Sequence, residues 1–198
     1  YRTSDNDPTQ NYYQCFVTTP YFNDEYILTR SVWTTHTVED YLAPAGFTNS
    51  SGRTNPTQNL VDSYETINGL PIDQDPTYGG GNPYQLIKVT DPKYTDVIML
   101  EEEIPYLHTR REPRFYADIA ADRTYWQLGP TTDHRYKVEV YQGEDFGLKE
   151  NRVNSLLRQN LTGYFLKKWI YSSCALHDYA TSLNSRGKRP FPLIRVAE

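Results

Sequence analysis

The sequence has little cysteine, no long apolar run and no cluster of positive charge, and each shortage excludes a class of protein. Its 198 residues hold only two cysteines, Cys15 and Cys174, in no metal-ligand spacing. This favours two buried thiols over a disulfide or a zinc site. No apolar run reaches the roughly 18 residues of a membrane-spanning helix. The net charge is −5 and basic residues occur at most in pairs, so a nucleic-acid partner is disfavoured.

Aromatic residues, by contrast, are abundant. They make up 14% of the chain and include 18 Tyr, although only 37% of the residues are hydrophobic and the mean hydropathy is −0.74. Disordered chains are poor in aromatic residues, so global disorder is excluded. We expect a folded, loop-rich body in which amphipathic rings carry much of the burial.

Residues 55–71 contain the clearest local signals. Asn55 can cap a helix, Pro56 suits its first position, and Gln58 lies three residues after the cap, where it can reach back. Apolar residues spaced three and four apart follow. Asn68-Gly69 is a turn signal, because both residues tolerate positive φ. The segment therefore predicts a short helix that runs into a reversal of the chain.

Elsewhere the sequence predicts short elements joined by loops. Helices are expected to begin at Pro8 and Val38 and to cover residues 113–121, where Arg114 and Asp118 can pair across one turn. Extended segments are expected at residues 26–28, 136–141 and 163–171, the last two as partners in a hairpin. Residues 73–83 hold three consecutive glycines and are expected to form a surface loop.

A catalytic centre is not indicated. The four histidines (His36, His108, His134 and His177) match no metalloprotease spacing, and no nucleophile motif is present. The triple glutamate at 101–103 is most simply a solvated surface, and no cofactor is expected. A glycosidase needs only two carboxylates, and 25 Asp and Glu offer many pairs. A glycan-active enzyme therefore stays open as an alternative.

Aromatic side chains in loops are the candidate binding residues. A flat ring can stack on the CH-rich face of a sugar while neighbouring polar groups bind its hydroxyls. The candidates that lie outside the periodic segments are Trp33, Tyr78, Tyr84, Tyr125 and Trp126. Packing over a polar fold is the alternative role for each of them, whereas Tyr64 and Trp169 are expected in the core.

Four stretches of the chain carry recognisable motifs. The first is Asn59-Leu60-Val61-Asp62-Ser63-Tyr64, with Asn68-Gly69 at its end. The others are Arg111-Glu112-Pro113-Arg114-Phe115-Tyr116, Gly163-Tyr164-Phe165-Leu166-Lys167-Lys168-Trp169, and Pro192-Leu193-Ile194-Arg195-Val196-Ala197-Glu198. In this order they resemble the signature blocks of the SusD/RagB family of surface glycan-binding lipoproteins, with Glu112 in place of the commoner Asp.

The resemblance implies a fold and a function. It implies a mainly α fold with long loops and small β-hairpins, part of an α-superhelix that contains tetratricopeptide-like repeats. It also implies a non-catalytic receptor, lipid-anchored in the outer membrane and facing outward. Such a receptor would bind a glycan and deliver it to a SusC-like TonB-dependent transporter. The alternatives are a peptide-binding lid of the RagB type and a purely structural lid.

The two ends of the chain lead to a further expectation. Residues 194–198 are predicted to form the first turn of a helix, and the chain starts at Tyr1 without a signal peptide or lipobox cysteine. We therefore expect residues 1–198 to form a single partial domain, with helical repeats and a lipid anchor outside it.

Overall fold

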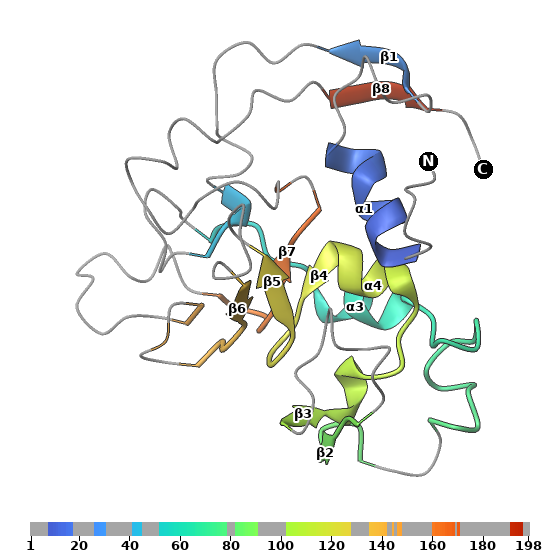
Figure 1. The fold of residues 1–198 in the computed structure, drawn as a ribbon, viewed down its shortest axis with the longest axis vertical. Coiled ribbons are helices and arrows are strands. Elements are labelled where there is room, and N and C mark those ends of the chain that lie inside the picture. Colours follow the sequence, from blue (N-terminus) through green and yellow to red (C-terminus); the bar gives the residue numbers. More distant parts are fainter. Residues whose placement is uncertain are drawn as a thin grey trace.

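The computed structural model describes most of the central chain and several shorter segments. The described residues are 8–17, 26–30, 41–44, 52–78, 82–90, 102–127, 135–141, 144, 146–147, 160–168, 170 and 191–195. They form short helices and short strands, arranged as Figure 1 shows. In chain order these are α1 (Pro8–Val17), β1 (Tyr26–Arg30), α3 (Gln58–Ser63), β2 (Leu86–Lys88), β3 (Glu103–Pro105), the 3-10 helix η3 (Tyr106–His108), α4 (Pro113–Asp118), β4 (Ile119–Ala120), β5 (Tyr125–Gln127), β6 (Arg135–Lys137), β7 (Phe165–Leu166) and β8 (Phe191–Arg195).

The strands form small antiparallel sheets, as expected. β1 pairs with β8, β2 with β3, β4 with β7 and β5 with β6, so each described sheet has two strands. The expectation of a mainly helical body is not what the described residues show, because α1, the longest helix among them, spans 10 residues. The superhelix of helical repeats stays a prediction.

Several local predictions are confirmed and others are wrong in detail. The helix at Pro8, the strand at residues 26–28 and the Asn68-Gly69 turn are present, with Gly69 at φ +72. The cap of α3 is Thr57, not Asn55, since the Thr57 hydroxyl accepts a hydrogen bond from the Leu60 N–H at 3.3 Å. The helix expected at Val38 lies largely outside the described residues.

Three other predictions are wrong because strands that are far apart in the sequence pair with each other. The expected hairpin between residues 136–141 and 163–171 is absent, because β6 pairs with β5 and β7 pairs with β4. The helix expected to begin at residue 194 does not begin there, because residues 191–195 form the strand β8, which pairs with β1. The helix from Pro113 ends at Asp118, and the chain continues directly into β4.

The β4–β7 pair lies between two hydrophobic clusters. Successive residues of a strand point to opposite faces, and so Ile119 and Ala120 belong to different clusters. The first cluster consists of Leu42, Ala43, Ala120, Trp126, Val138, Phe146, Phe165 and Ile170. The second consists of Val61, Val89, Ile104, Phe115, Tyr116, Ile119, Ala121 and Tyr164. A strand pair of only two residues per strand thus organises both halves of the core.

A small polar cluster lies where α4 ends. The buried carboxylate of Asp118, at the end of α4, accepts a hydrogen bond from the Tyr64 hydroxyl at 2.7 Å and lies 3.5 Å from the Lys168 ammonium. Burial raises the pKa of Asp118, and Lys168 opposes that rise. The predicted Arg114–Asp118 pair is therefore wrong, because Arg114 pairs with Glu112 instead. The role expected for Tyr64 is confirmed only in part, since its ring is half-buried.

Arg111 joins α3 to the segment before α4. Its side chain is 1% exposed, and every acceptor of its guanidinium is a backbone carbonyl. Nη2 donates to the carbonyls of Val61 (2.6 Å) and Tyr64 (2.7 Å), Nη1 to Leu107 (3.2 Å) and Nε to Glu65 (3.4 Å). The last carbonyls of a helix have no partner within the helix, and Arg111 supplies one.

Replacement of Arg111 should therefore cost far more than an ordinary surface change. We expect Arg111→Lys to lower the free energy of unfolding by about 2–4 kcal/mol, because a single ammonium cannot reach four carbonyls and buried unpaired acceptors are costly. Urea unfolding measures the loss. Arg110→Lys is the matched control and should change stability by less than about 0.5 kcal/mol. Equal effects of the two substitutions would contradict this role for Arg111.

His108, at the end of η3, is a second buried polar group in this region. Its Nδ1 donates to the Asp122 carbonyl (3.2 Å), and its Nε2 lies 3.3 Å from the Tyr164 hydroxyl, which can donate to it. Both nitrogens are thus satisfied in the neutral ring. Burial, with the Arg111 charge as a lesser cause, lowers the pKa of His108 to about 4.

This lowered pKa predicts a stability that depends on pH. As the pH falls below the ordinary value of 6.5, the unfolded chain binds a proton that the folded chain does not, and stability is lost until about pH 4. The loss should approach about 3 kcal/mol. The buried Asp118 and the half-buried Asp122, whose pKa values are raised by burial, contribute stability as the pH falls and so act in the opposite direction.

Comparison with His108→Asn separates the contribution of His108 from that of the carboxylates. Urea unfolding at pH 7 and pH 4.5 should show a smaller loss of stability in the variant than in the wild type. The same loss in both proteins would show that His108 is not the group responsible.

Candidate functional site

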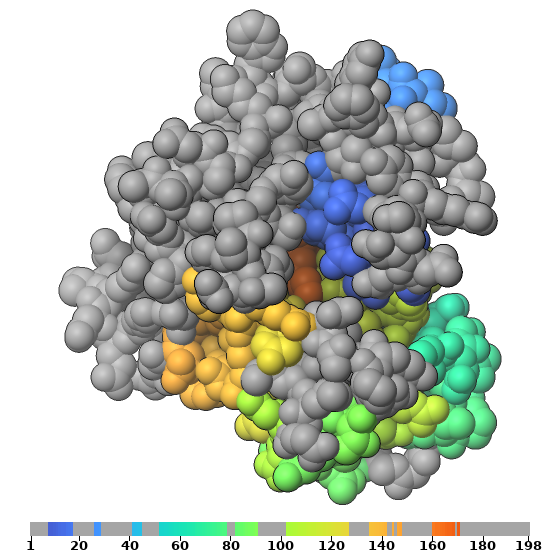
Figure 2. All heavy atoms as spheres, viewed as in Figure 1, coloured from blue at the N-terminus to red at the C-terminus, as the bar shows by residue number. Residues whose placement is uncertain are grey.

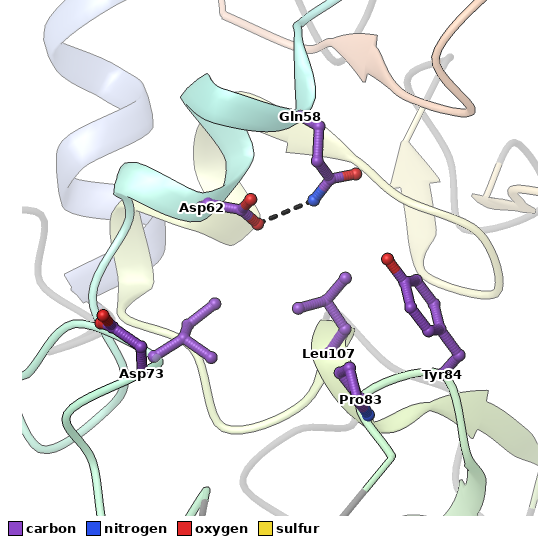
Figure 3. A pocket seen from close by; sticks show the side chains of 7 residues that line it. Gln58, Asp62, Asp73, Pro83, Tyr84 and Leu107 are labelled. Carbon is purple, nitrogen blue, oxygen red and sulfur yellow. Dashed lines mark hydrogen bonds between the residues drawn. The ribbon is translucent and has the colours of Figure 1, made fainter.

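A pocket of about 460 Å³ opens between α3, the turn that follows residue 71 and the start of η3. Its size lies within the range of small-molecule sites in proteins. The lining side chains are Gln58, Asp62, Ile72, Asp73, Pro83, Tyr84 and Leu107. Figure 3 shows Tyr84 at one end and Asp73 at the other, with α3 above and Leu107 below. Apolar and hydrogen-bonding groups thus face one space.

Tyr84 is the exposed ring of this pocket, with 68% of its surface open to solvent. The turn that carries it is anchored at both sides. The Asn82 side chain accepts a hydrogen bond from the Tyr84 N–H at 3.0 Å. The Leu107 N–H donates to the Pro83 carbonyl and the Tyr106 N–H to the Gln85 carbonyl, at 2.9 and 2.8 Å. An exposed ring on an anchored turn can stack on a ligand at little entropic cost.

Helix α3 supplies the polar wall. Gln58 and Asp62 lie four residues apart and therefore on one face of the helix. The Gln58 amide donates to the Asp62 carboxylate at 2.7 Å (Figure 3). This bond orients both side chains and leaves the second Asp62 oxygen as an acceptor.

The opposite wall is a loop organised by Asp75. The buried Asp75 carboxylate accepts hydrogen bonds from the hydroxyls of Thr66 (2.5 Å) and Thr77 (2.7 Å) and from the Asn68 amide (3.1 Å). These bonds, that of Thr66 first, hold the pKa of Asp75 well below its usual range. The loop that carries Ile72 and Asp73 is thereby held in one conformation.

Tyr78 ties this loop to η3. Its ring stacks on Tyr106 at 4.6 Å between centroids, and its hydroxyl donates to the carbonyls of Tyr106, at 3.0 Å, and Thr109. The Tyr106 hydroxyl returns a bond to the Thr77 carbonyl at 2.7 Å. Burial raises the pKa of Tyr78 to about 12.

The structure separates the five predicted binding residues. Tyr84 is exposed at the pocket, as expected of a platform. The expectation that Tyr78 and Trp126 present their rings to solvent is wrong, since they are 6% and 3% exposed. Tyr78 is the strut just described, and Trp126 lies in β5, where cross-strand pairing directs its indole into the first cluster.

The other two candidates do not join the pocket. The half-buried Tyr125 ring lies on β5, with the Arg135 guanidinium 3.9 Å from its centroid, and is not among the lining residues. Trp33, like Trp169 and Gly79–Gly81, lies outside the described residues.

The polar half of the pocket was missed by sequence reasoning. From the sequence, Gln58 was interpreted only as a capping partner of a helix, and Asp62 only as part of a family block. The available signal was their i, i+4 spacing on a short helix, which places two hydrogen-bonding side chains side by side. Asp73 carried no such signal, because its turn is fixed by the hydrogen bonds of the Asp75 carboxylate and by the Gln74 and Asp75 N–H groups, which donate to the Pro71 carbonyl.

Neither a metal-binding cluster nor a membrane-spanning helix is found among the residues that the structure describes. Among them, no group of three or more His, Cys, Asp or Glu is placed to hold a metal ion. None of the helices in these segments is long and apolar enough to cross a bilayer. Of the two cysteines, Cys15 is buried with its thiol 3.3 Å from the Asn11 carbonyl, and Cys174 lies outside the described ranges.

The family blocks of the sequence converge in this part of the fold. The Glu65 N–H donates to the Glu112 carboxylate at 2.9 Å, and the Glu112 N–H donates back to the Glu65 carbonyl at 3.0 Å, so the first two blocks are bonded to each other. The third block places Tyr164 in the same cluster as Phe115. In Figure 2 the described residues of α3, β2 and β3, in teal and green, lie in the lower part of the molecule, away from β1 at the top.

A model of the SusD family matches residues 3–198. The chain belongs to the SusD family. Proteins of this family are generally non-catalytic and bind glycans beside a SusC-like transporter, typically as outer-membrane lipoproteins. A comparison with curated proteins finds no match.

Solved structures of SusD-like proteins share the fold of this SusD-family chain. A SusD-like protein from Bacteroides fragilis, BF3747, is 20% identical with a TM-score of 0.59, over 98% of this chain and 34% of its own. The structure described as BT4246 is 17% identical with a TM-score of 0.67, over 94% of this chain and 30% of its own. The chain thus spans about a third of the length of these proteins.

The strut role of Tyr78 in this SusD-family fold can be tested by removal of its hydroxyl alone. We expect Tyr78→Phe to lower the free energy of unfolding by about 1–3 kcal/mol, because the buried Thr109 carbonyl loses the Tyr78 donor, whereas the Tyr106 carbonyl keeps its bonds from Thr109. Tyr141→Phe is the control, since Tyr141 is 51% exposed, and it should change stability by less than about 0.5 kcal/mol. Both are measured by urea unfolding. A Tyr78→Phe protein as stable as the wild type would contradict the structural role of the Tyr78 hydroxyl.

Proposed function

We propose that this protein is a non-catalytic glycan-binding protein of the cell surface that holds a saccharide at the Tyr84 pocket. Family membership supports the class of function, and the exposed Tyr84 ring beside hydrogen-bonding groups supports the place. The ring offers a flat apolar face for the CH groups of a sugar. Gln58, Asp62 and Asp73 offer acceptors for its hydroxyls, together with a donor from the amide.

The proposal extends to transport. By its family, the protein delivers the captured glycan to a SusC-like TonB-dependent transporter and is held at the outer membrane by a lipid. Weak binding suits this task, because a ligand that must be passed on has to dissociate. One stacked ring with a few hydrogen bonds gives affinities of about micromolar to millimolar order.

Substitution of Tyr84 tests the binding site. Tyr84→Ala should weaken binding of the retained glycan by about tenfold to a hundredfold, because burial of one ring against a ligand is worth about 1–3 kcal/mol. Tyr84→Phe should retain most of the affinity. Affinity electrophoresis and calorimetry against a panel of polysaccharides measure both variants.

Tyr141→Ala is the matched control, because it removes an exposed ring away from the pocket. It should leave binding unchanged, and neither substitution should alter stability by more than about 0.5 kcal/mol. A simultaneous substitution of Tyr78 and Trp126 by Ala is not a test of binding, because both rings are buried and their loss would destabilise the fold.

Three outcomes of the panel would overturn the proposal. Binding of oligopeptides in place of glycans would favour a peptide-binding lid. Release of shortened products from a bound glycan would favour an enzyme. Co-purification with a transporter while neither ligand class is retained would favour a structural lid.

A further inference from the structure

The Tyr84 pocket has a one-sided charge. Of its lining residues, Asp62 and Asp73 are carboxylates, and none is basic. Both are exposed, whereas Arg111, whose charge acts on Asp62, is 1% exposed and gives its donors to backbone carbonyls. A ligand in the pocket therefore contacts carboxylates and no basic side chain, and the buried Arg111 charge offsets Asp62 only in part.

We propose that this pocket selects sugars by charge: it prefers an amine-bearing sugar, accepts a neutral one and rejects a uronate or a sulfated sugar. The inference rests on the glycan-binding function proposed above and names the class of ligand. Asp62 and Asp73 are then the residues that determine specificity.

The aromatic end of the pocket agrees with the acidic end. The face of an aromatic ring carries negative electrostatic potential, which attracts an ammonium group and repels an anion. In Figure 3 the ring of Tyr84 and the side chain of Asp73 lie at opposite ends, with Asp62 between them on α3. The electrostatic potential at both ends of the pocket therefore favours an ammonium group over an anion.

The Gln58–Asp62 hydrogen bond sharpens this preference. It uses one of the two N–H groups of the Gln58 amide, which lies 2.7 Å from the Asp62 carboxylate. The second N–H is the one donor that Gln58 can still offer to a sugar. An anionic sugar thus meets the acceptors of Asp62 and Asp73 and a single amide donor, whereas hydroxyl and ammonium groups can donate to both carboxylates.

The size of the effect follows from Coulomb's law. In a solvent-exposed site, a unit charge about 4 Å from a carboxylate changes affinity roughly fivefold. Two carboxylates should therefore separate an amine-bearing sugar from a uronate by about tenfold to a hundredfold at low salt. The preference should shrink as salt rises above 0.15 M, since exposed charges are then screened over a few ångströms.

The test uses the same glucan in three charge states. Amylose, laminarin and soluble cello-oligosaccharides are each presented unmodified, with an amino group at C6, or oxidised to the uronate at C6. Binding of each form is measured by calorimetry with the wild-type protein and with the double variant Asp62→Asn, Asp73→Asn. Asn keeps the size of the side chain and an acceptor for Gln58, so only the charge is removed.

Glu103→Gln is the control, since Glu103 is an exposed carboxylate on β3 that does not line the pocket. We expect the wild type and Glu103→Gln to bind the amine form about tenfold to a hundredfold more tightly than the uronate form. In the double variant the two forms should bind within about threefold of each other.

Two results would overturn the inference, and they differ in what they imply for the function. If the wild type binds a neutral glucan but favours its uronate, or if the amine preference persists in the double variant, charge selection by this pocket is refuted and glycan binding stands. If the wild type binds none of the glucans or their derivatives, both this inference and the proposed function fail.

Discussion

The structure depends on how the end of α3 is bonded to the segment before α4. A short helix ends with carbonyls that lack partners, and burial of such groups is costly. Here one guanidinium, that of Arg111, bonds the carbonyls of Val61, Tyr64 and Glu65 and also that of Leu107. Because α3 carries one wall of the pocket and Leu107 lies on its floor, the same interaction sets the shape of the site.

Aromatic residues compensate for the shortage of aliphatic ones in this fold. Tyr64, Tyr78, Tyr116 and Tyr164 pack their rings in the interior or at its edge while their hydroxyls bond buried polar groups. This explains how a chain of low mean hydropathy builds a core around such short strands. It also explains why aromatic content by itself is a poor guide to the binding site, since most of these rings serve the interior and Tyr84 is the exposed one at the pocket.

Sequence reasoning succeeded where the signal is local. The helix at Pro8, the Asn68-Gly69 turn and the family blocks depend on residues a few positions apart, and all were recognised. It failed where contacts with residues far away in the sequence determine the secondary structure or the direction of a side chain. Residues 191–195 became a strand because β1 lies beside them, and Trp126 turned inward because β5 pairs with β6. Arg114 pairs with Glu112, while Asp118 contacts Lys168 from a distant segment.

By itself, the sequence determined the family, the loop-rich character of the chain and several short elements and turns, although it misplaced the cap of α3 by two residues. These properties depend on residues that are close in the sequence and can therefore be recognised without knowledge of the fold. Only the tertiary structure decided which rings face solvent and which side chains share a pocket. Gln58, Asp73 and Tyr84 come from three separate segments, and only long-range hydrogen bonds, such as those of Arg111 and Tyr78, bring those segments together.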